Sequence, residues 1–194
     1  MDLFAEEGFG ATSIPDICTR AGLTKGAFYS NFANKDALFL ALLDRSWARR
    51  AEWLRRAVPS GDAVASGPAE GTPAPSTEVD RQWTLVSVEF SLHAIRRPDV
   101  AALLVEHEVR VRSELAVLVA EALEREGRVP TLPVLDLARM IVALSEGSDI
   151  QALTDEAAGA TVRADLARRA VPALLAHFSR PTEALTEGGG GGRP

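Results

Sequence analysis

An all-α fold is predicted for this chain of 194 residues by three features of its sequence. Apolar residues recur at spacings of three and four, which place them on one face of a helix, and they do not alternate as they would in strands. Glycine and proline divide the chain into a succession of such blocks. Because 46% of the residues are hydrophobic, the helices can bury a continuous core, and an ordinary globular protein is expected.

The overall charge gives no general support for binding to nucleic acid, because the formal net charge is −6. Any argument for DNA must therefore depend on local residues. The single cysteine, Cys18, cannot form an intramolecular disulfide and is expected to be a buried thiol in a reducing cytoplasm. No apolar run approaches the roughly 18 to 20 residues that span a bilayer, and acidic residues stand where a signal peptide carries basic ones. A soluble, cytoplasmic protein is expected.

The N-terminal part of the chain consists of short helical blocks. Residues 1–7 form one block, which ends at Gly8 because glycine suits a helix C-cap. Thr12 or Ser13 can cap a second helix, which Gly22 ends. The apolar residues of this second helix form one continuous stripe: Ile14, Ile17, Cys18 and Ala21.

A third short helix follows after the joint 21–23, and this tight connection is typical of a helix-turn-helix. Thr24 is a good N-cap for the third helix, which buries Phe28 and Phe32. Asn34 caps a fourth, long helix, whose apolar residues are Leu38, Phe39, Leu42, Leu43, Trp47 and Leu54.

The remainder of the chain is predicted to hold a larger helical bundle. Residues 58–77 contain four prolines and three glycines and are expected to form a flexible loop. Helices are predicted over 78–97, over 99–126 as one or two helices, over 133–154 and over 161–178. The end of the chain, 179–194, contains a run of glycines and is expected to be a disordered tail. The predicted domains are therefore 1–44 and 45–178.

The segment 11–43 carries the most specific pattern. The chain reads LFAEEGFGATSI, then ICTRAGL, then TKGAFYSNFANK. In the order and spacing of these phrases, the first quarter of the chain resembles the DNA-binding domain of the TetR family of helix-turn-helix transcriptional regulators. The resemblance implies a three-helix DNA-binding domain followed by a helical domain that binds a small molecule and dimerises.

Several residues of the third helix have the chemistry that a DNA-recognition helix needs. Thr24 brings a hydroxyl to a helix N-terminus, where backbone N–H groups favour phosphate, and Lys25 adds positive charge. Gly26 has no side chain to hold the backbone and a phosphate apart. The resemblance implies that Ala27 meets bases, where its methyl group can contact a thymine methyl. It also implies phosphate contacts for the matching positions Thr12, Ser13, Tyr29, Asn31 and Lys35.

Two features depart from the family pattern. The first helix of the family usually begins well upstream of its Leu-Phe-Ala-Glu phrase, which here starts at Leu3, so a truncated first helix is expected. Residues 1–46 hold four basic and six acidic side chains, a local charge of −2, and fewer cations weaken binding to phosphates. An upstream helical extension is therefore expected to raise DNA affinity.

The C-terminal domain gives weaker indications, because bundles that bind ligands and bundles that only pack share one apolar periodicity. Aromatic walls with a few polar groups are typical of small-molecule sites, although core packing explains the same residues. On this basis the candidate ligand contacts are Trp83, Glu89, Phe90, His93, His107 and Met140. No catalytic set, metal site or cofactor is predicted, since His93, His107 and His177 lie on separate helices without partners at ligand spacing.

The leading hypothesis is a homodimeric, ligand-responsive repressor that binds a palindromic DNA operator. Its last two long helices are too apolar to face water alone and are expected to pair with their copies in a four-helix interface. The candidate interface residues are Leu144, Leu174, Leu175 and Phe178. The alternative is a truncated paralogue that keeps the sensing bundle and binds DNA weakly or not at all, and an α-helical enzyme is a third possibility.

Overall fold

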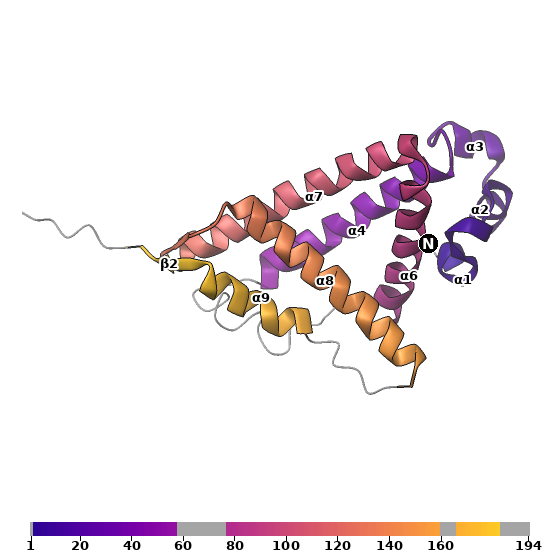
Figure 1. Ribbon diagram of the computed structural model, residues 1–194. Helices are drawn as coiled ribbons and strands as arrows, with labels where there is room; N and C mark the ends of the chain where they lie inside the picture. The colour runs from indigo at the N-terminus through magenta and orange to yellow at the C-terminus, as the bar shows by residue number, and fades with distance from the viewer. Residues whose placement is uncertain (1, 58–76, 160–165, 183–194) are drawn as a thin grey trace, which may run out of the picture.

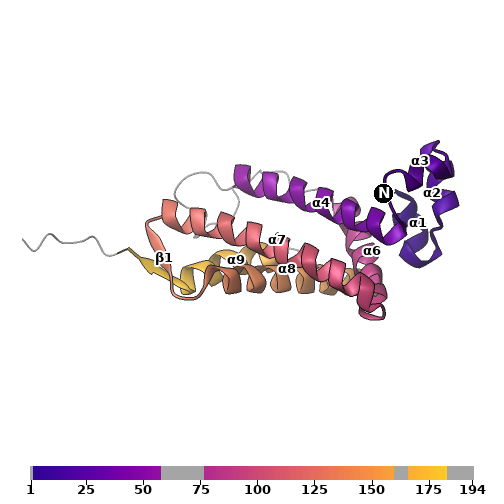
Figure 2. The same ribbon diagram turned by 90° about the horizontal axis from the view of Figure 1, so that it is seen from above.

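The computed structural model describes residues 2–57, 77–159 and 166–182 of the chain, and almost all of these residues are helical. The predicted all-α fold is confirmed: the short helices of residues 2–29 form a small head at one end, and the longer helices form the body (Figures 1 and 2). The elements in order are α1 (Asp2–Ala11), α2 (Ile14–Ala21), α3 (Lys25–Tyr29), α4 (Lys35–Ala57), α6 (Thr77–Ile95), α7 (Pro98–Arg125), β1 (Arg128–Pro130), α8 (Val134–Ala157), α9 (Leu166–His177) and β2 (Ser179–Pro181).

Local capping explains why α2 and α3 begin and end where they do. Ser13 is the N-cap of α2, and its side chain accepts a hydrogen bond from the Asp16 N–H while Asp16 accepts one from the Ser13 N–H. Gly22 ends α2 in the left-handed conformation, with φ of 64°. Thr24 caps α3, and its Oγ1 accepts from the Ala27 N–H at 3.1 Å. These predicted helix boundaries are confirmed.

The head joins the body through a shared aromatic core. Phe4 and Phe9 of α1 pack with Phe39 of α4 and Phe90 of α6, and all four side chains are almost fully buried. The rings of Phe9 and Phe90 lie 5.0 Å apart in a T-shaped arrangement. Because burial of apolar surface is the main favourable term in folding, this cluster keeps the head attached to α4 and α6.

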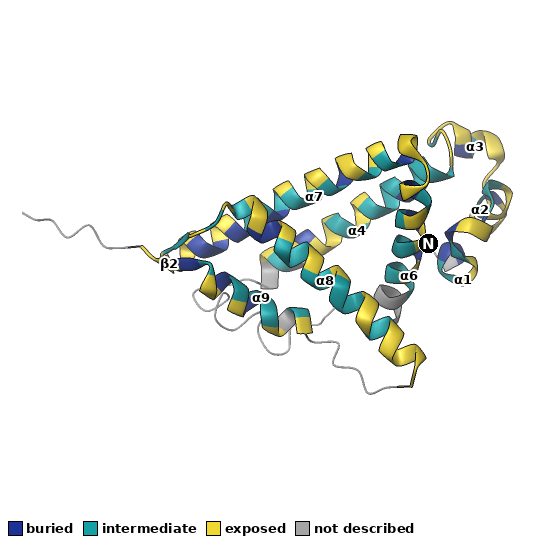
Figure 3. Cartoon of the chain, viewed as in Figure 1, coloured by how far each residue is buried: buried dark blue, intermediate teal, exposed yellow. Residues whose placement is uncertain are grey.

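A second core cluster holds the far half of the body together. Leu115, Val119 and Leu123 of α7 pack against Leu137 of α8 and Leu175 of α9, and Trp47 of α4 packs on this group. α7 and α8 pack together near β1 and diverge toward their other ends (Figure 1). Figure 3 shows the result for the chain: buried positions follow the inner faces of the long helices, while α2 and α3 are largely exposed.

Residues 98–125 form one continuous helix, α7, which is one of the two arrangements expected for this segment. Two other sequence-based boundaries need correction. The disordered tail cannot begin at Ser179, because β2 pairs antiparallel with β1 and Ser179 Oγ accepts from Arg128 Nε at 2.7 Å. The expected loop ends one residue earlier, since α6 begins at Thr77. The predictions for 58–76, 160–165 and 183–194 lie outside the described residues.

Candidate nucleic-acid interface

The exposed surface of the head is formed by α3 and the joint before it. Thr24, Lys25 and Gly26 are exposed at the start of α3, and Ala27 is half-buried behind them. Tyr29 is 56% exposed, although the edge of its ring packs on buried Phe28 at 5.3 Å between centroids. The structure therefore brings five of the predicted DNA-facing residues together on one short helix and its cap.

Gly26 has no structural reason to be glycine in the free protein. Its φ is not positive, unlike that of Gly22. A Cβ added at Gly26 would meet only Thr24 Oγ1, at 3.7 Å, which is an ordinary contact distance. Since glycine also weakens a helix, its presence is better explained by something that approaches the backbone from outside.

The remaining polar residues near α3 are held by the helix itself. Asn31 is exposed and its Nδ2 donates to Ala27 O at 2.9 Å. Ser13 is half-buried at the start of α2, where its hydroxyl serves as the cap. Asn31 follows α3 and Ser13 precedes α2, and the predicted phosphate contacts of both residues stay predictions.

Thr12 lies in a different environment from the other predicted DNA-facing residues. Its side chain is only 1% exposed, and its Oγ1 donates to Gly8 O at 2.7 Å. This hydroxyl therefore closes the end of α1 and does not lie on the surface that α3 presents.

The Lys35 ammonium is also engaged inside the protein. Its Nζ donates to Phe9 O at 2.5 Å and to Thr12 O at 2.7 Å, and it lies 4.4 Å from the centre of the Phe9 ring. Burial lowers the pKa of Lys35, and the charge of Asp36 opposes that shift. In this conformation the ammonium is occupied by carbonyl groups, so it is not displayed for a phosphate.

The four candidate ligand contacts on α6 lie where this helix meets α1 and α4. Trp83 stacks on Phe39 at 5.6 Å, and Phe90 is fully buried against Phe9. Glu89 Oε2 accepts from the Phe9 N–H at 2.6 Å. His93 Nε2 lies 3.1 Å from Asp36 Oδ1 of α4. The structure thus places this group at the junction of head and body, and its predicted ligand role is untested.

His107 is buried on α7, and its polar contact is with α4. Its Nδ1 lies 2.6 Å from Asp44 Oδ1, and Arg110 also donates to that carboxylate. Burial opposes ionisation of Asp44, but the hydrogen bonds from Arg110 and His107 outweigh it, so the pKa of Asp44 lies below its ordinary value. Asp36, Asp44 and Arg110 were not foreseen from the sequence, because each is distant along the chain from the residue that it contacts.

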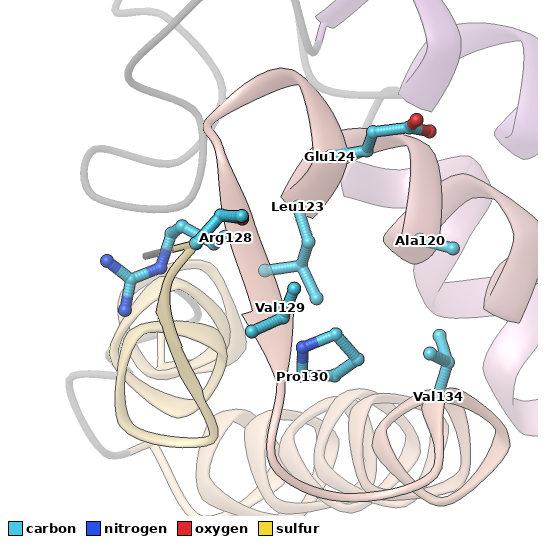
Figure 4. A pocket seen from close by; sticks show the side chains of 8 residues that line it. Ala120, Leu123, Glu124, Arg128, Val129, Pro130 and Val134 are labelled. Atoms are coloured by element: carbon cyan, nitrogen blue, oxygen red, sulfur yellow. The ribbon is translucent and has the colours of Figure 1, made fainter. Parts of the chain in front are cut away.

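A pocket of about 430 Å³ lies at the far end of the body, next to β1 and β2. Figure 4 shows side chains from the end of α7, from β1 and from the start of α8 around it. None of the candidate ligand contacts lines this pocket, and Met140 is half-buried elsewhere on α8. The lining residues are Ala120, Leu123, Glu124, Arg128, Val129, Pro130, Val134 and Thr182.

The candidate interface residues on α8 and α9 differ in burial. Leu175 is 7% exposed and belongs to the core of the chain itself. Leu174 and Phe178 are half-buried and pack against that core. Leu144 is half-buried and belongs to neither core cluster of the described residues. Leu144 is therefore the candidate least committed to packing within one chain.

Two further features are not found in the described parts of the chain. Within 2–57, 77–159 and 166–182, no three side chains of His, Cys, Asp or Glu come together as a metal site would require. None of the described helices combines the length and the apolar character needed to cross a bilayer.

An exposed helix-turn-helix on a separate helical body defines the class of a DNA-binding regulator. Comparison with known families agrees with this class. The model for bacterial regulatory proteins of the tetR family matches residues 1–42, and the model for the C-terminal part of BetI-type transcriptional repressors matches residues 72–178. The chain belongs to the TetR family of bacterial regulatory proteins. It is a DNA-binding transcriptional regulator.

Individual relatives are also regulators. The chain is 26% identical to the HTH-type transcriptional regulator UidR of Escherichia coli K12 over 153 residues, which are 78% of this chain and 77% of UidR. It is 28% identical to EthR of Mycolicibacterium smegmatis over 188 residues, covering 91% of this chain and 78% of EthR. A shorter match, 51% identical over 39 residues, covers 20% of this chain and 14% of the uncharacterized regulator YerO of Bacillus subtilis.

The fold itself is found in solved structures. Salmonella enterica GusR superposes with a TM-score of 0.62 over 90% of each chain, at 21% sequence identity. At this identity the likeness shows the arrangement of helices and no more.

Proposed function

We propose that the protein is a ligand-responsive transcriptional repressor of the cytoplasm, acting as a homodimer on a palindromic operator. The observation that carries the proposal is the helix-turn-helix of α2 and α3, which stands at one end of the molecule with α3 exposed (Figure 2). In this proposal residues 1–44 bind DNA, and residues 45–178 sense the ligand and dimerise.

The DNA-facing surface is proposed to be the exposed side of α3 with the start of α2. Lys25 supplies charge for a phosphate, Gly26 lets the backbone approach it closely, and the Tyr29 hydroxyl adds a hydrogen bond. The Ala27 methyl group meets a base edge in the major groove. Ser13, Thr24 and Asn31 complete the contact from the flanks, whereas Thr12 and Lys35 act from within by holding the chain that leads into α2.

Dimerisation is proposed through the outer faces of α8 and α9. Apolar side chains remain exposed on both helices in the single chain: Leu135 is 48% exposed, Ile150 44% and Leu166 41%. A second copy would cover such groups, and Leu144, Leu174 and Phe178 lie in or beneath the contact. A twofold dimer would then present two α3 helices to successive major grooves.

The effector is proposed to bind within the helical body, with His107 of α7 and Met140 of α8 near it. His107 is buried on α7 beside Asp44 of α4, and Met140 is half-buried on α8, the helix that packs against α7. A ligand that binds one arrangement of the body more tightly would shift the separation of the two heads. By linkage, the factor by which the ligand changes DNA affinity equals the ratio of the ligand's affinity for the DNA-bound protein to its affinity for the free protein.

An unbiased selection of bound DNA tests this proposal directly. Purified protein is mixed with random duplexes at one fixed salt concentration, and enriched sequences are counted after several rounds. A palindromic sequence bound by two chains is the expected result. The matched control is the variant Lys25→Ala, which should enrich the same sequence more weakly. A dimer that enriches no sequence but binds small molecules would support the alternative of a sensing bundle with a weak DNA-binding head.

A further inference from the structure

The main chain of Phe9 is held from two sides by charged side chains of different elements. Its N–H donates to Glu89 Oε2 of α6 at 2.6 Å. Its carbonyl accepts from Lys35 Nζ, at the start of α4, at 2.5 Å. Bonds of this charge-assisted kind are shorter and about twice as strong as neutral ones. One residue of the head is thus fixed to two helices of the body.

Gly8 makes this arrangement possible. Its φ of 81° and ψ of 163° interrupt α1 immediately before Phe9, so the regular helical hydrogen bonding breaks at this point. A Cβ on residue 8 would lie 2.8 Å from Glu89 Oε2 and 3.0 Å from Oε1. Glycine is therefore required here twice, for its positive φ and for the space that the carboxylate occupies.

The residues after Phe9 pass this restraint on to the helix-turn-helix. Thr12 Oγ1 donates to Gly8 O at 2.7 Å, and Thr12 O accepts from the same Lys35 ammonium at 2.7 Å. The next residue, Ser13, is already the N-cap of α2. Only three residues, 10–12, therefore lie between Phe9, which Glu89 contacts, and the N-cap of α2, and hydrogen bonds hold the chain between them.

We propose that Glu89 is a positioning residue, which sets the orientation of the helix-turn-helix relative to α6 by binding the Phe9 N–H at the Gly8 break. A displacement of α6 along its axis moves the carboxylate and therefore the entry into α2. The aromatic cluster beneath keeps the head attached, while this bond fixes its angle. The role in DNA affinity rests on the operator binding proposed above.

The test compares Glu89→Ala and Glu89→Gln with the unaltered protein. Glutamine keeps an oxygen that can accept from the Phe9 N–H, whereas alanine removes it. Glu106→Ala is the matched control, because Glu106 is an exposed carboxylate on α7 for which the described part of the chain offers no ion pair. Amide hydrogen exchange of residues 9–32 in the free protein is measured together with thermal melting and with affinity for the selected operator.

We expect Glu89→Ala to speed exchange at Phe9 by about tenfold to a hundredfold, the range that corresponds to loss of one charge-assisted hydrogen bond. Operator affinity should fall by a similar factor, whereas amide exchange in α7 and α8 should not change. In Glu89→Gln, both exchange at Phe9 and operator affinity should return close to the values of the unaltered protein. Unchanged exchange at Phe9 would overturn the proposal, and so would faster exchange with unaltered operator affinity. A residue that only contacts an effector would leave the Phe9 amide unaffected in the free protein. If the unaltered protein selects no operator, the proposed function fails, while the exchange data still decide whether Glu89 holds the head.

Discussion

Replacing Gly26 by alanine should have opposite effects on the stability of the fold and on DNA binding. In the free protein the new methyl group meets only Thr24 Oγ1, at 3.7 Å, and the backbone of Gly26 does not require positive φ. Alanine is about 1 kcal/mol more favourable than glycine within a helix. The melting temperature of Gly26→Ala should therefore be equal to or higher than that of the unaltered protein.

Operator binding should change in the opposite direction. A methyl group on the exposed start of α3 would hold a DNA phosphate away from the backbone, and a hydrogen bond to a charged group is worth about 1.5 to 3 kcal/mol. Since about 1.4 kcal/mol is a factor of ten in affinity, the dissociation constant should rise between tenfold and a hundredfold.

The assay is fluorescence anisotropy with the selected operator at one fixed salt concentration, together with thermal melting followed by circular dichroism. Gly10→Ala is the matched control, because a Cβ at Gly10 meets nothing within 4 Å and its φ is not positive either. This control should bind DNA normally. A stable Gly26→Ala protein with unaltered affinity would refute the placement of α3 against the DNA backbone.

Three further predictions concern charge and assembly. Lys25→Ala should reduce the slope of log affinity against log salt concentration by about one. Lys35→Ala should lower the melting temperature and the operator affinity but leave that slope unchanged, because the Lys35 ammonium is bound to carbonyl groups. Equal slopes for both variants would contradict this. The pKa of Asp44 is lower in the folded chain, so its contribution to stability is complete above the ordinary value of 3.8 and is lost as pH falls through the lowered value. Asp44→Asn should therefore flatten the acid side of the stability curve, and urea unfolding at several pH values checks it. Leu144→Asp should give folded monomers in sedimentation, whereas Leu175→Asp should unfold the chain because Leu175 is core; a folded dimer of Leu144→Asp would place the interface elsewhere.

Local chemistry made the head largely predictable from its sequence. The cap of α2 involves Ser13 and Asp16, three residues apart, and Gly22 ends the helix through its own φ. Such features depend only on neighbouring residues, so composition and spacing reveal them. The β1–β2 pair was missed for a related reason: each strand has three residues, too few for an alternating pattern to be visible.

Contacts between distant residues account for what the sequence did not reveal. Glu89 and Phe9 are 80 residues apart, and His107 and Asp44 are 63 apart. A polar residue on an apolar helix has the same local signature whether it faces a ligand or another helix. Glu89 and His93 were therefore assigned to a ligand site from composition, and only the packing of α6 against α1 and α4 shows which groups they contact.

The junction combines two kinds of interaction with different consequences. The aromatic cluster around Phe9 and Phe90 attaches the head to the body through apolar contact, which depends little on direction. The polar contacts, in which Glu89, His93 and His107 of α6 and α7 meet groups of α1 and α4, depend on distance and angle. A small shift of α6 or α7 would therefore weaken the directional contacts before it weakened the apolar ones. Such a junction permits the head to change its orientation without detaching. A regulator needs this property if a conformational change in its body is to alter its affinity for DNA.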